Sequence, residues 1–424
     1  MGFCINSLTG RKMKSIERLP EALHNSVRSG IVICDFARIV EELVFNSLDA
    51  GSTKRKSNPC LHKWKKPVTS GLKPLVPDSP QVSVSVGVGN YYVKVDDNGS
   101  GFTRDGLLLL GERYATSKID HLALMDTGSE NLDFHGEALC SISDASLLEI
   151  VTKARGKPNG YRKIMKNSKC VFLEINDDRQ DVGTTVTVRD IFYNQPVRRK
   201  HMKSSPKKVL DSIKLSVLRI ALVHLNVSFK VLDVESADVL LLTGASSSPL
   251  PILSSYFGIE NSVTFHKLDL SDGELKLAGY ISDPRGFLSP KTIQYVCIHI
   301  MVLLMLFSGD INSRFVYKGP IYKLLNQLAA KFDSLSSWQP ATTSCQSEKR
   351  NKYDICPMFI LNLHCPRSYY DIFTSDRTSV EFKAEKKYHG AFFFYLQYAM
   401  GLNPTRGYVS CDTAVCRIGV LYLL

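Results

Sequence analysis

The segment 36–48 constrains the fold most, because its apolar side chains recur at helical spacing. These side chains are Phe36, Ile39, Val40, Leu43, Val44 and Leu48. Apolar residues three and four positions apart form one stripe of an α-helix, so we expect this helix to pack against a core. Glu42, Asn46 and Asp49 fall at i, i+4 and i+7 and point together from another side of the helix. The helix is therefore predicted to carry a carboxylate and an amide one turn apart.

The next ordered segment is predicted to be a β-hairpin that leads into a glycine-rich loop. Apolar and small residues alternate over 82–88, Gly89-Asn90 forms a turn, and 91–95 alternates again. The loop that follows reads Asp97-Asn-Gly-Ser-Gly101. Its two glycines let the backbone approach a ligand, and Asp97 can accept a hydrogen bond from an amine such as that of adenine. Alone, the loop is also explained as a turn.

The helix and a third segment offer groups for magnesium and phosphate chemistry. Magnesium prefers oxygen ligands and keeps several waters, so the Asn46 amide oxygen can hold the ion while Glu42 polarises a water. Taken alone, this pair is better explained as a solvated polar face. Gly136 precedes a predicted helix start, where free backbone amides bind phosphate oxygens. Many helices begin after glycine without binding anything.

The rest of the chain is predicted to alternate helices and strands. A short helix capped by Thr103 ends near Gly111, a strand covers 186–192, and a second αβ unit begins at about Ser204. The helices of this unit are expected at 209–223 and 321–332, and its strands at 227–232, 275–281, 311–316 and 358–363. Three segments interrupt the pattern: 55–81 is rich in Lys, Arg and Pro, 297–310 is apolar, and 334–352 is predicted to be flexible.

Charge and hydropathy limit the classes of partner. Lys and Arg outnumber Asp and Glu by 53 to 41, which gives a formal charge of +12 and favours nucleic acid over a membrane surface. The longest apolar run, 295–307, is too short for a helix that crosses a bilayer, which needs about 20 residues. We therefore expect no membrane partner. The cysteines include no CxxC pair, which indicates a reducing compartment without structural zinc.

Five motifs resemble, in their order, those of the gyrase, Hsp90, histidine-kinase and MutL (GHKL) ATPases. They are Glu42-Leu-Val-Phe-Asn46-Ser-Leu-Asp49-Ala-Gly51, Asp97-Asn-Gly-Ser-Gly101, Ala115-Thr-Ser-Lys118, Gly136-Glu-Ala-Leu139 and Gly183-Thr-Thr185. Two stretches resemble the MutL branch alone: Arg113-Tyr-Ala-Thr-Ser-Lys118-Ile and Arg189-Asp-Ile-Phe-Tyr-Asn-Gln-Pro196-Val-Arg-Arg199-Lys. The sequence around Tyr161, Lys208 and Ile311-Asn-Ser-Arg314 is most similar to the eukaryotic MutL homologue three, and a plant source is expected. The resemblance covers about 15–383.

The resemblance implies a site for ATP and Mg²⁺. Glu42 would be the general base, Asn46 the magnesium ligand and Asp97 the adenine reader. Gly99 and Gly101 would be close-approach positions, and Thr184 would back the adenine. The other implied nucleotide contacts are Asp49, Thr116, Ser117, Lys118, His135, Gly136, Glu137, Ala138, Leu139 and Arg377. Asp133 and His135 replace the family's usual glycine and arginine in the implied lid, and Arg377 replaces its usual lysine, so we expect weaker closure.

The implied fold class is α+β. A GHKL (Bergerat) ATPase α/β sandwich over 1–203 would precede a ribosomal-S5-like αβ transducer over 204–383 and a divergent tail over 384–424. The segments 55–81 and 297–310 are inserts relative to the family, because removing them restores its register. The endonuclease and dimerisation region of the family is not expected in this chain.

The resemblance implies an ATP-binding, slowly hydrolysing DNA clamp subunit of mismatch repair, in the nucleus, with a role in meiotic recombination. The implied partners are DNA, another MutL homologue and MutS homologues. Arg198, Arg199 and Lys200 are candidate DNA contacts, although a solvated helix start explains them about as well. Two alternatives stay open: a catalytically impaired, truncated module that binds nucleotide or DNA without turnover, and, less favoured, a chaperone or kinase of the same superfamily.

Overall fold

The computed structural model describes residues 29–30, 32–52, 81–111, 137–259, 265–272, 275–282, 294–300, 311–316, 322, 326, 358–365, 370–372 and 380–382. The helices are α2 (Phe36–Ser47), α3 (Arg104–Leu109), α5 (Glu137–Asp144), α6 (Pro196–Ser204), α7 (Pro206–Val223) and α8 (Leu250–Phe257), and the π-helical turn η1 (Leu48–Ser52) extends α2. No helix in these ranges has the length and apolar content needed to cross a membrane.

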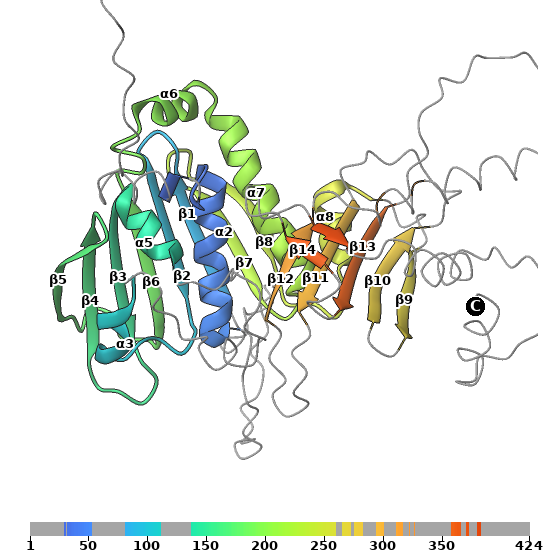
Figure 1. The fold of residues 1–424 in the computed structure, drawn as a ribbon, viewed down its shortest axis with the longest axis horizontal. Helices are drawn as coiled ribbons and strands as arrows, with labels where there is room; N and C mark the ends of the chain where they lie inside the picture. Colours follow the sequence, from blue (N-terminus) through green and yellow to red (C-terminus); the bar gives the residue numbers. More distant parts are fainter. Residues whose placement is uncertain are drawn as a thin grey trace, which may run out of the picture.

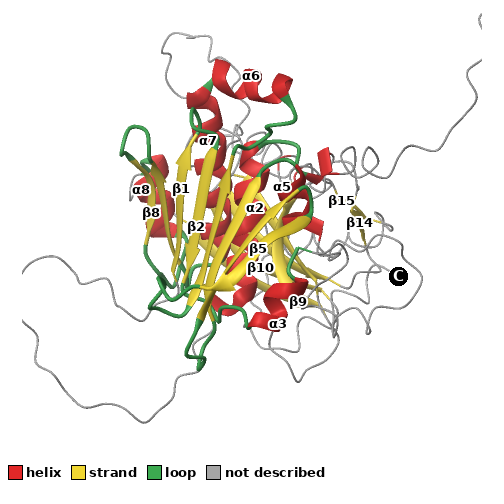
Figure 2. Ribbon diagram, turned by 90° about the vertical axis from the view of Figure 1, so that its left-hand side faces the viewer, coloured by secondary structure: helices red, strands yellow, loops and turns green. Residues whose placement is uncertain are grey.

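Eight strands form one mixed sheet in the order β5-β4-β3-β6-β2-β1-β7-β8. They are β1 (Gln81–Gly87), β2 (Tyr92–Asp97), β3 (Leu147–Lys153), β4 (Gly160–Lys166), β5 (Lys169–Ile175), β6 (Gly183–Arg189), β7 (Ser228–Asp233) and β8 (Val239–Thr243). Neighbouring strands are antiparallel except β1 and β7, which are parallel. Helices α2, α5 and α7 lie against one face of this sheet (Figures 1 and 2).

Helix α2 joins the core as its apolar spacing predicts. Its side chains Phe36, Val40 and Leu43 are buried and face the alternating buried valines of β1 and β2. The helix begins after Asp35, whose side chain accepts a hydrogen bond from the Arg38 backbone N–H at 2.8 Å. The predicted hairpin and the predicted cap on α3 are confirmed as well, since the Thr103 side chain accepts from the Gly106 N–H.

The strand expected over 186–192 ends earlier than predicted. Its last residue in the sheet is Arg189, because Asp190 and Phe192 adopt positive φ angles of 55° and 58°, which a strand does not accommodate. The chain therefore turns away from the sheet three residues early. This turn carries it into α6.

The sequence predicts that the strand at 227–232 belongs to a second αβ unit, and the structure shows that this prediction is wrong. This strand is β7, which pairs in parallel with β1 and continues the first sheet, with β8 at its edge. Helix α7 packs against α2 on the same core. The sheet that begins with β1 thus extends past the predicted boundary between residues 203 and 204. The division into three segments otherwise stays a prediction.

A second, five-stranded sheet has the order β12-β11-β13-β10-β9. Its strands are β9 (Phe265–Asp272), β10 (Leu275–Ser282), β11 (Gln294–Ile300), β12 (Ile311–Val316) and β13 (Phe359–Cys365), and β14 (Tyr370–Ile372) pairs with β15 (Val380–Phe382). The first four residues of the predicted insert 297–310 belong to β11. All four pair with β13, and Cys297, Ile298 and Ile300 also pair with β12. Helix α7 links the two sheets, since the Arg219 guanidinium lies 5.7 Å from the ring centre of Tyr295 on β11.

Candidate functional site

The glycine-rich loop 97–101 is held between the end of α2 and the end of β3. The Ser100 N–H donates to the Ala50 carbonyl at 2.8 Å, and the Ser100 carbonyl accepts from the Arg155 N–H at 3.0 Å. A Cβ on Gly99 would lie 2.9 Å from the Ala50 carbonyl oxygen, and one on Gly101, whose φ is +67°, would lie 2.1 Å from that of Lys153. Both glycines are therefore required by contacts within the chain, whatever they do for a ligand.

Asp97 is a buried carboxylate with a fixed orientation. Its side chain has 4% exposure, and its Oδ1 accepts from the Gly99 N–H at 2.9 Å and the Thr184 N–H at 3.3 Å. Burial raises the pKa of Asp97, while hydrogen bonds from Gly99, Ser47 and Thr184 and the charge of Arg179 act in the opposite direction. A carboxylate held this way suits recognition of a single amine.

Thr184 lies behind Asp97 together with Thr152, which sequence reasoning missed. The two hydroxyl oxygens are 3.1 Å apart. The Thr152 hydroxyl also accepts from the Phe102 N–H at 2.9 Å and donates to the Gly183 carbonyl at 3.1 Å, so Thr184 must be the donor between the two threonines. Thr152 faces Thr184 across the β3–β6 pair. Only the strand pairing reveals this neighbour.

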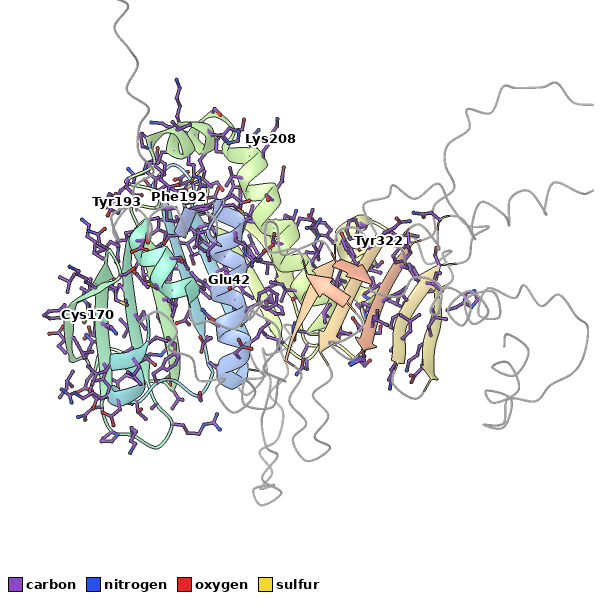
Figure 3. All side chains as sticks on the ribbon, viewed as in Figure 1. Glu42, Cys170, Phe192, Tyr193, Lys208 and Tyr322 are labelled. Carbon is purple, nitrogen blue, oxygen red and sulfur yellow. The ribbon has the colours of Figure 1, made fainter. Side chains whose placement is uncertain are left out.

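Glu42 lies midway along α2 (Figure 3) and is buried, with 8% exposure. Its Oε1 is 2.5 Å from Nη2 of Arg38, one turn earlier on the helix, and both side chains are largely inaccessible. Burial lowers the pKa of Arg38, but the carboxylates of Glu42 and Glu41 outweigh it, so the pKa of Arg38 rises above its usual value. The alternative of a solvated polar face therefore does not describe Glu42.

Asn46 and Asp49 follow Glu42 along the same helix. Asn46 is half-buried one turn further on, and Asp49 is exposed on η1. An amide oxygen beside a buried carboxylate is a donor set that magnesium accepts when phosphates and waters complete its coordination. The chemistry of these residues thus fits the predicted ion.

The remaining predicted nucleotide contacts divide into two groups. Thr116, Ser117, Lys118, His135, Gly136 and Arg377 lie outside the described residues. Glu137 is the first residue of α5, which confirms the helix predicted behind Gly136. Ala138 is half-buried and Leu139 belongs to the core with 9% exposure, so the Leu139 side chain serves packing.

Comparison with known proteins places the chain in a family, although no family model matches it. The DNA mismatch repair protein MLH3 of Arabidopsis thaliana is 45% identical over 372 residues, which are 88% of this chain and 25% of that protein. The MutL protein of Halothermothrix orenii is 30% identical over 272 residues, or 64% of this chain and 37% of that protein. The chain belongs to the MutL family.

Two further comparisons refine the position of this MutL-family chain. Human Mlh3 is 25% identical over 375 residues, covering 87% of this chain and 23% of that protein. The predicted similarity to MutL homologue three, with a plant-like sequence, is thus confirmed. A crystal structure of the N-terminal domain of a DNA repair protein shares the fold, with a TM-score of 0.61 at 18% identity over 91% of this chain and 98% of that one. The predicted α+β fold class is confirmed, and the chain spans only about a quarter of the two MLH3 proteins.

The MutL motif that ends at Lys200 has a structural task in this fold. The Arg198 guanidinium donates to the carbonyls of Ile33 at 2.7 Å and Gly30 at 2.9 Å, and Arg199 donates to the Ile191 carbonyl at 2.8 Å. Both guanidiniums also lie over aromatic rings. Of the three predicted DNA contacts, Lys200 is the one whose side chain is exposed.

Proposed function

We propose that this chain binds ATP with Mg²⁺ and hydrolyses it slowly. The observation that carries the proposal is the buried pair on α2, in which the Glu42 carboxylate is held by Arg38 one turn before Asn46. Burying two charges is costly, so such a pair in the helix that carries the predicted catalytic motif is more readily explained by chemistry than by stability. The adenine reader Asp97 supports the same assignment.

Each residue has a separate task in this proposal. The Asp97 carboxylate accepts a hydrogen bond from the adenine amine, and Asn46 supplies an amide oxygen to the magnesium ion, which neutralises phosphate charge when bound. Glu42 would orient a water and accept its proton as the water attacks the terminal phosphorus. The bond from that phosphorus to the bridging oxygen breaks and ADP leaves, and the proton then passes to solvent. The contact with Arg38 competes with a water for the Glu42 carboxylate, which is consistent with slow turnover.

The decisive test compares Glu42→Ala with Glu41→Ala in the intact chain. Glu41 precedes Glu42 on the same helix and also pairs with Arg38, at 3.2 Å, so it is a matched control. Nucleotide binding is measured by calorimetry and turnover by phosphate release. We expect Glu42→Ala to bind ATP but lose turnover by at least a hundredfold, the usual scale for removal of a general base, while Glu41→Ala stays within a few-fold of the unmodified chain.

Two results would contradict the proposal. Equal turnover in both variants would remove Glu42 from the chemistry. Binding of ATP without turnover by the unmodified chain would instead support the second candidate, a module that holds nucleotide or DNA and turns nothing over. That candidate is favoured by His135 and Arg377, which depart from the residues usual in the family.

We extend the proposal to the role of the chain in the cell. ATP binding would bring two such domains together as a clamp around DNA, and hydrolysis would reset it. The setting would be nuclear mismatch repair and meiotic recombination, with another MutL homologue and MutS homologues as partners. The names of the MLH3 and MutL relatives support the repair role.

A further inference from the structure

Arg179, in the loop between β5 and β6, is an almost buried cation that the proposed chemistry leaves without a task. Its side chain is 13% exposed. The guanidinium donates to the Asp97 carbonyl at 2.7 Å and to the Asp96 carboxylate at 2.7 Å. It also contacts the Thr185 hydroxyl and donates to the Asp181 carbonyl within its own loop. One side chain thus joins β2, β6 and the loop at Asp97, the carboxylate proposed to bind adenine.

The two sides of Asp97 are held by different groups. The carboxylate is oriented by the N–H groups of Gly99 and Thr184, and the carbonyl by Arg179. Gly183 makes room for this arrangement, because a Cβ there would lie 2.1 Å from the Asp97 carbonyl oxygen and 2.6 Å from Nη2 of Arg179. The Asp97 backbone, from which the carboxylate projects, therefore cannot shift without breaking its contact with Arg179.

We propose that Arg179 is a specificity-determining positioning residue, which holds Asp97 where its carboxylate selects adenine over guanine. This inference rests on the proposed ATP site. Adenine presents an amine donor where guanine presents a carbonyl acceptor, so a fixed carboxylate favours adenine. Guanine also carries a donor amine on its neighbouring edge, and a carboxylate that is free to shift can accept from it. Selectivity consequently depends on holding Asp97 still.

The test measures the affinities of non-hydrolysable ATP and GTP analogues for the full chain with magnesium, by calorimetry. The variants are Arg179→Met, Arg179→Lys and the control Arg162→Met, which removes a guanidinium on β4 that pairs with Glu149 on β3. We expect Arg179→Met to lower the preference for the ATP analogue about tenfold, the scale of one lost charge-assisted hydrogen bond. The preference of Arg179→Lys should lie between those of the unmodified chain and Arg179→Met, because an ammonium cannot make all the hydrogen bonds of the planar guanidinium. Arg162→Met should keep the original preference.

Three results would overturn the inference, in distinguishable ways. An unchanged preference in Arg179→Met, with both affinities retained, gives the residue no role in the site. Equal losses for both analogues assign it a purely structural role, which thermal unfolding would show as a lowered Tm. If Arg179→Met does not fold, the ratio of the two affinities is measured in Arg179→Lys and judged by the same criteria. If the unmodified chain binds neither analogue, the proposed function is contradicted, and this inference is contradicted with it.

Discussion

Arg38 and Glu42 show how two charges are accommodated inside α2. Each is about nine-tenths inaccessible, and the 2.5 Å contact between them compensates part of the loss of hydration. The pairing is local, since residues four apart face each other on a helix. Removing Arg38 takes this contact away from a carboxylate that stays buried, which costs more than the pair itself contributes.

This reasoning predicts strong coupling between the two residues. Arg38→Met alone should lower the free energy of unfolding by about 3 kcal/mol, and adding Glu42→Gln should recover at least about 1 kcal/mol, because a buried charge that has lost its contact with Arg38 is removed. Urea unfolding of the unmodified chain, the two single variants and the double variant gives the coupling energy of this double-mutant cycle. The same cycle with Glu41→Gln is the control and should show weaker coupling, since Glu41 is more exposed and lies 3.2 Å away. Additive effects in the Glu42 cycle would show that the pair is not a unit.

At the scale of elements, the short helix α3 is held by a lysine from the sheet. Lys163 on β4 is 1% exposed, and its ammonium donates to the carbonyls of Leu107, Leu108 and Leu110 at 2.7–2.9 Å. These carbonyls belong to the C-terminal end of α3, where the partial negative charge of a helix favours a cation. A helix of six residues is marginal by itself, so this contact substitutes for intrinsic helical stability.

Replacing this lysine should therefore destabilise the domain. Lys163→Met removes a buried charged donor that three carbonyls share, and we expect the free energy of unfolding to fall by about 3 kcal/mol. The control is Lys169→Met on the neighbouring strand β5, where the side chain is exposed and a change of less than about 0.5 kcal/mol is expected. The change in the free energy of unfolding of each variant is obtained from its urea unfolding midpoint. Equal midpoints for the two variants would mean that water replaces the ammonium without cost.

On the scale of the whole molecule, positive charge gathers where α6 meets α7. Exposed lysines in this corner are Lys200, Lys203, Lys207 and Lys208, and Figure 3 shows Lys208 at the start of α7. Arg198 and Arg199 lie among them in sequence but are bound to backbone carbonyls within the chain. We therefore assign the proposed phosphate contacts to the lysines of this corner.

The salt dependence of DNA binding tests this assignment. Changing the four lysines to Gln should reduce the slope of log affinity against log salt by roughly 0.9 for each lysine that contacts a phosphate. A control variant with the same loss of charge changes Lys157, Lys166, Lys169 and Lys230, which lie elsewhere in the first sheet region. Fluorescence anisotropy with duplex DNA at several salt concentrations gives both slopes. Equal slopes for the two variants would place DNA on another surface.

The sequence alone determined the features that depend on local patterns. Apolar spacing predicted α2, alternation predicted the β1–β2 hairpin, and the ordered motifs around Glu42, Asp97 and Gly183 indicated the family before any fold was known. These signals succeed because helical and strand periodicities, and turns that need glycine, are properties of neighbouring residues. The pairing of Arg38 with Glu42 belongs to the same class but was overlooked, although its i, i+4 spacing was visible.

Only the tertiary structure decided which distant residues meet. It brought Thr152 to Thr184, Arg179 to the carbonyl of Asp97 and Lys163 to the end of α3, and it joined β7 to β1. Each contact spans dozens of residues along the chain, and its partners are chosen by strand pairing and by burial of a shared core. The sequence suggests that Arg198 and Arg199 are surface charges. In the folded chain both guanidiniums instead donate hydrogen bonds to backbone carbonyls of the protein itself.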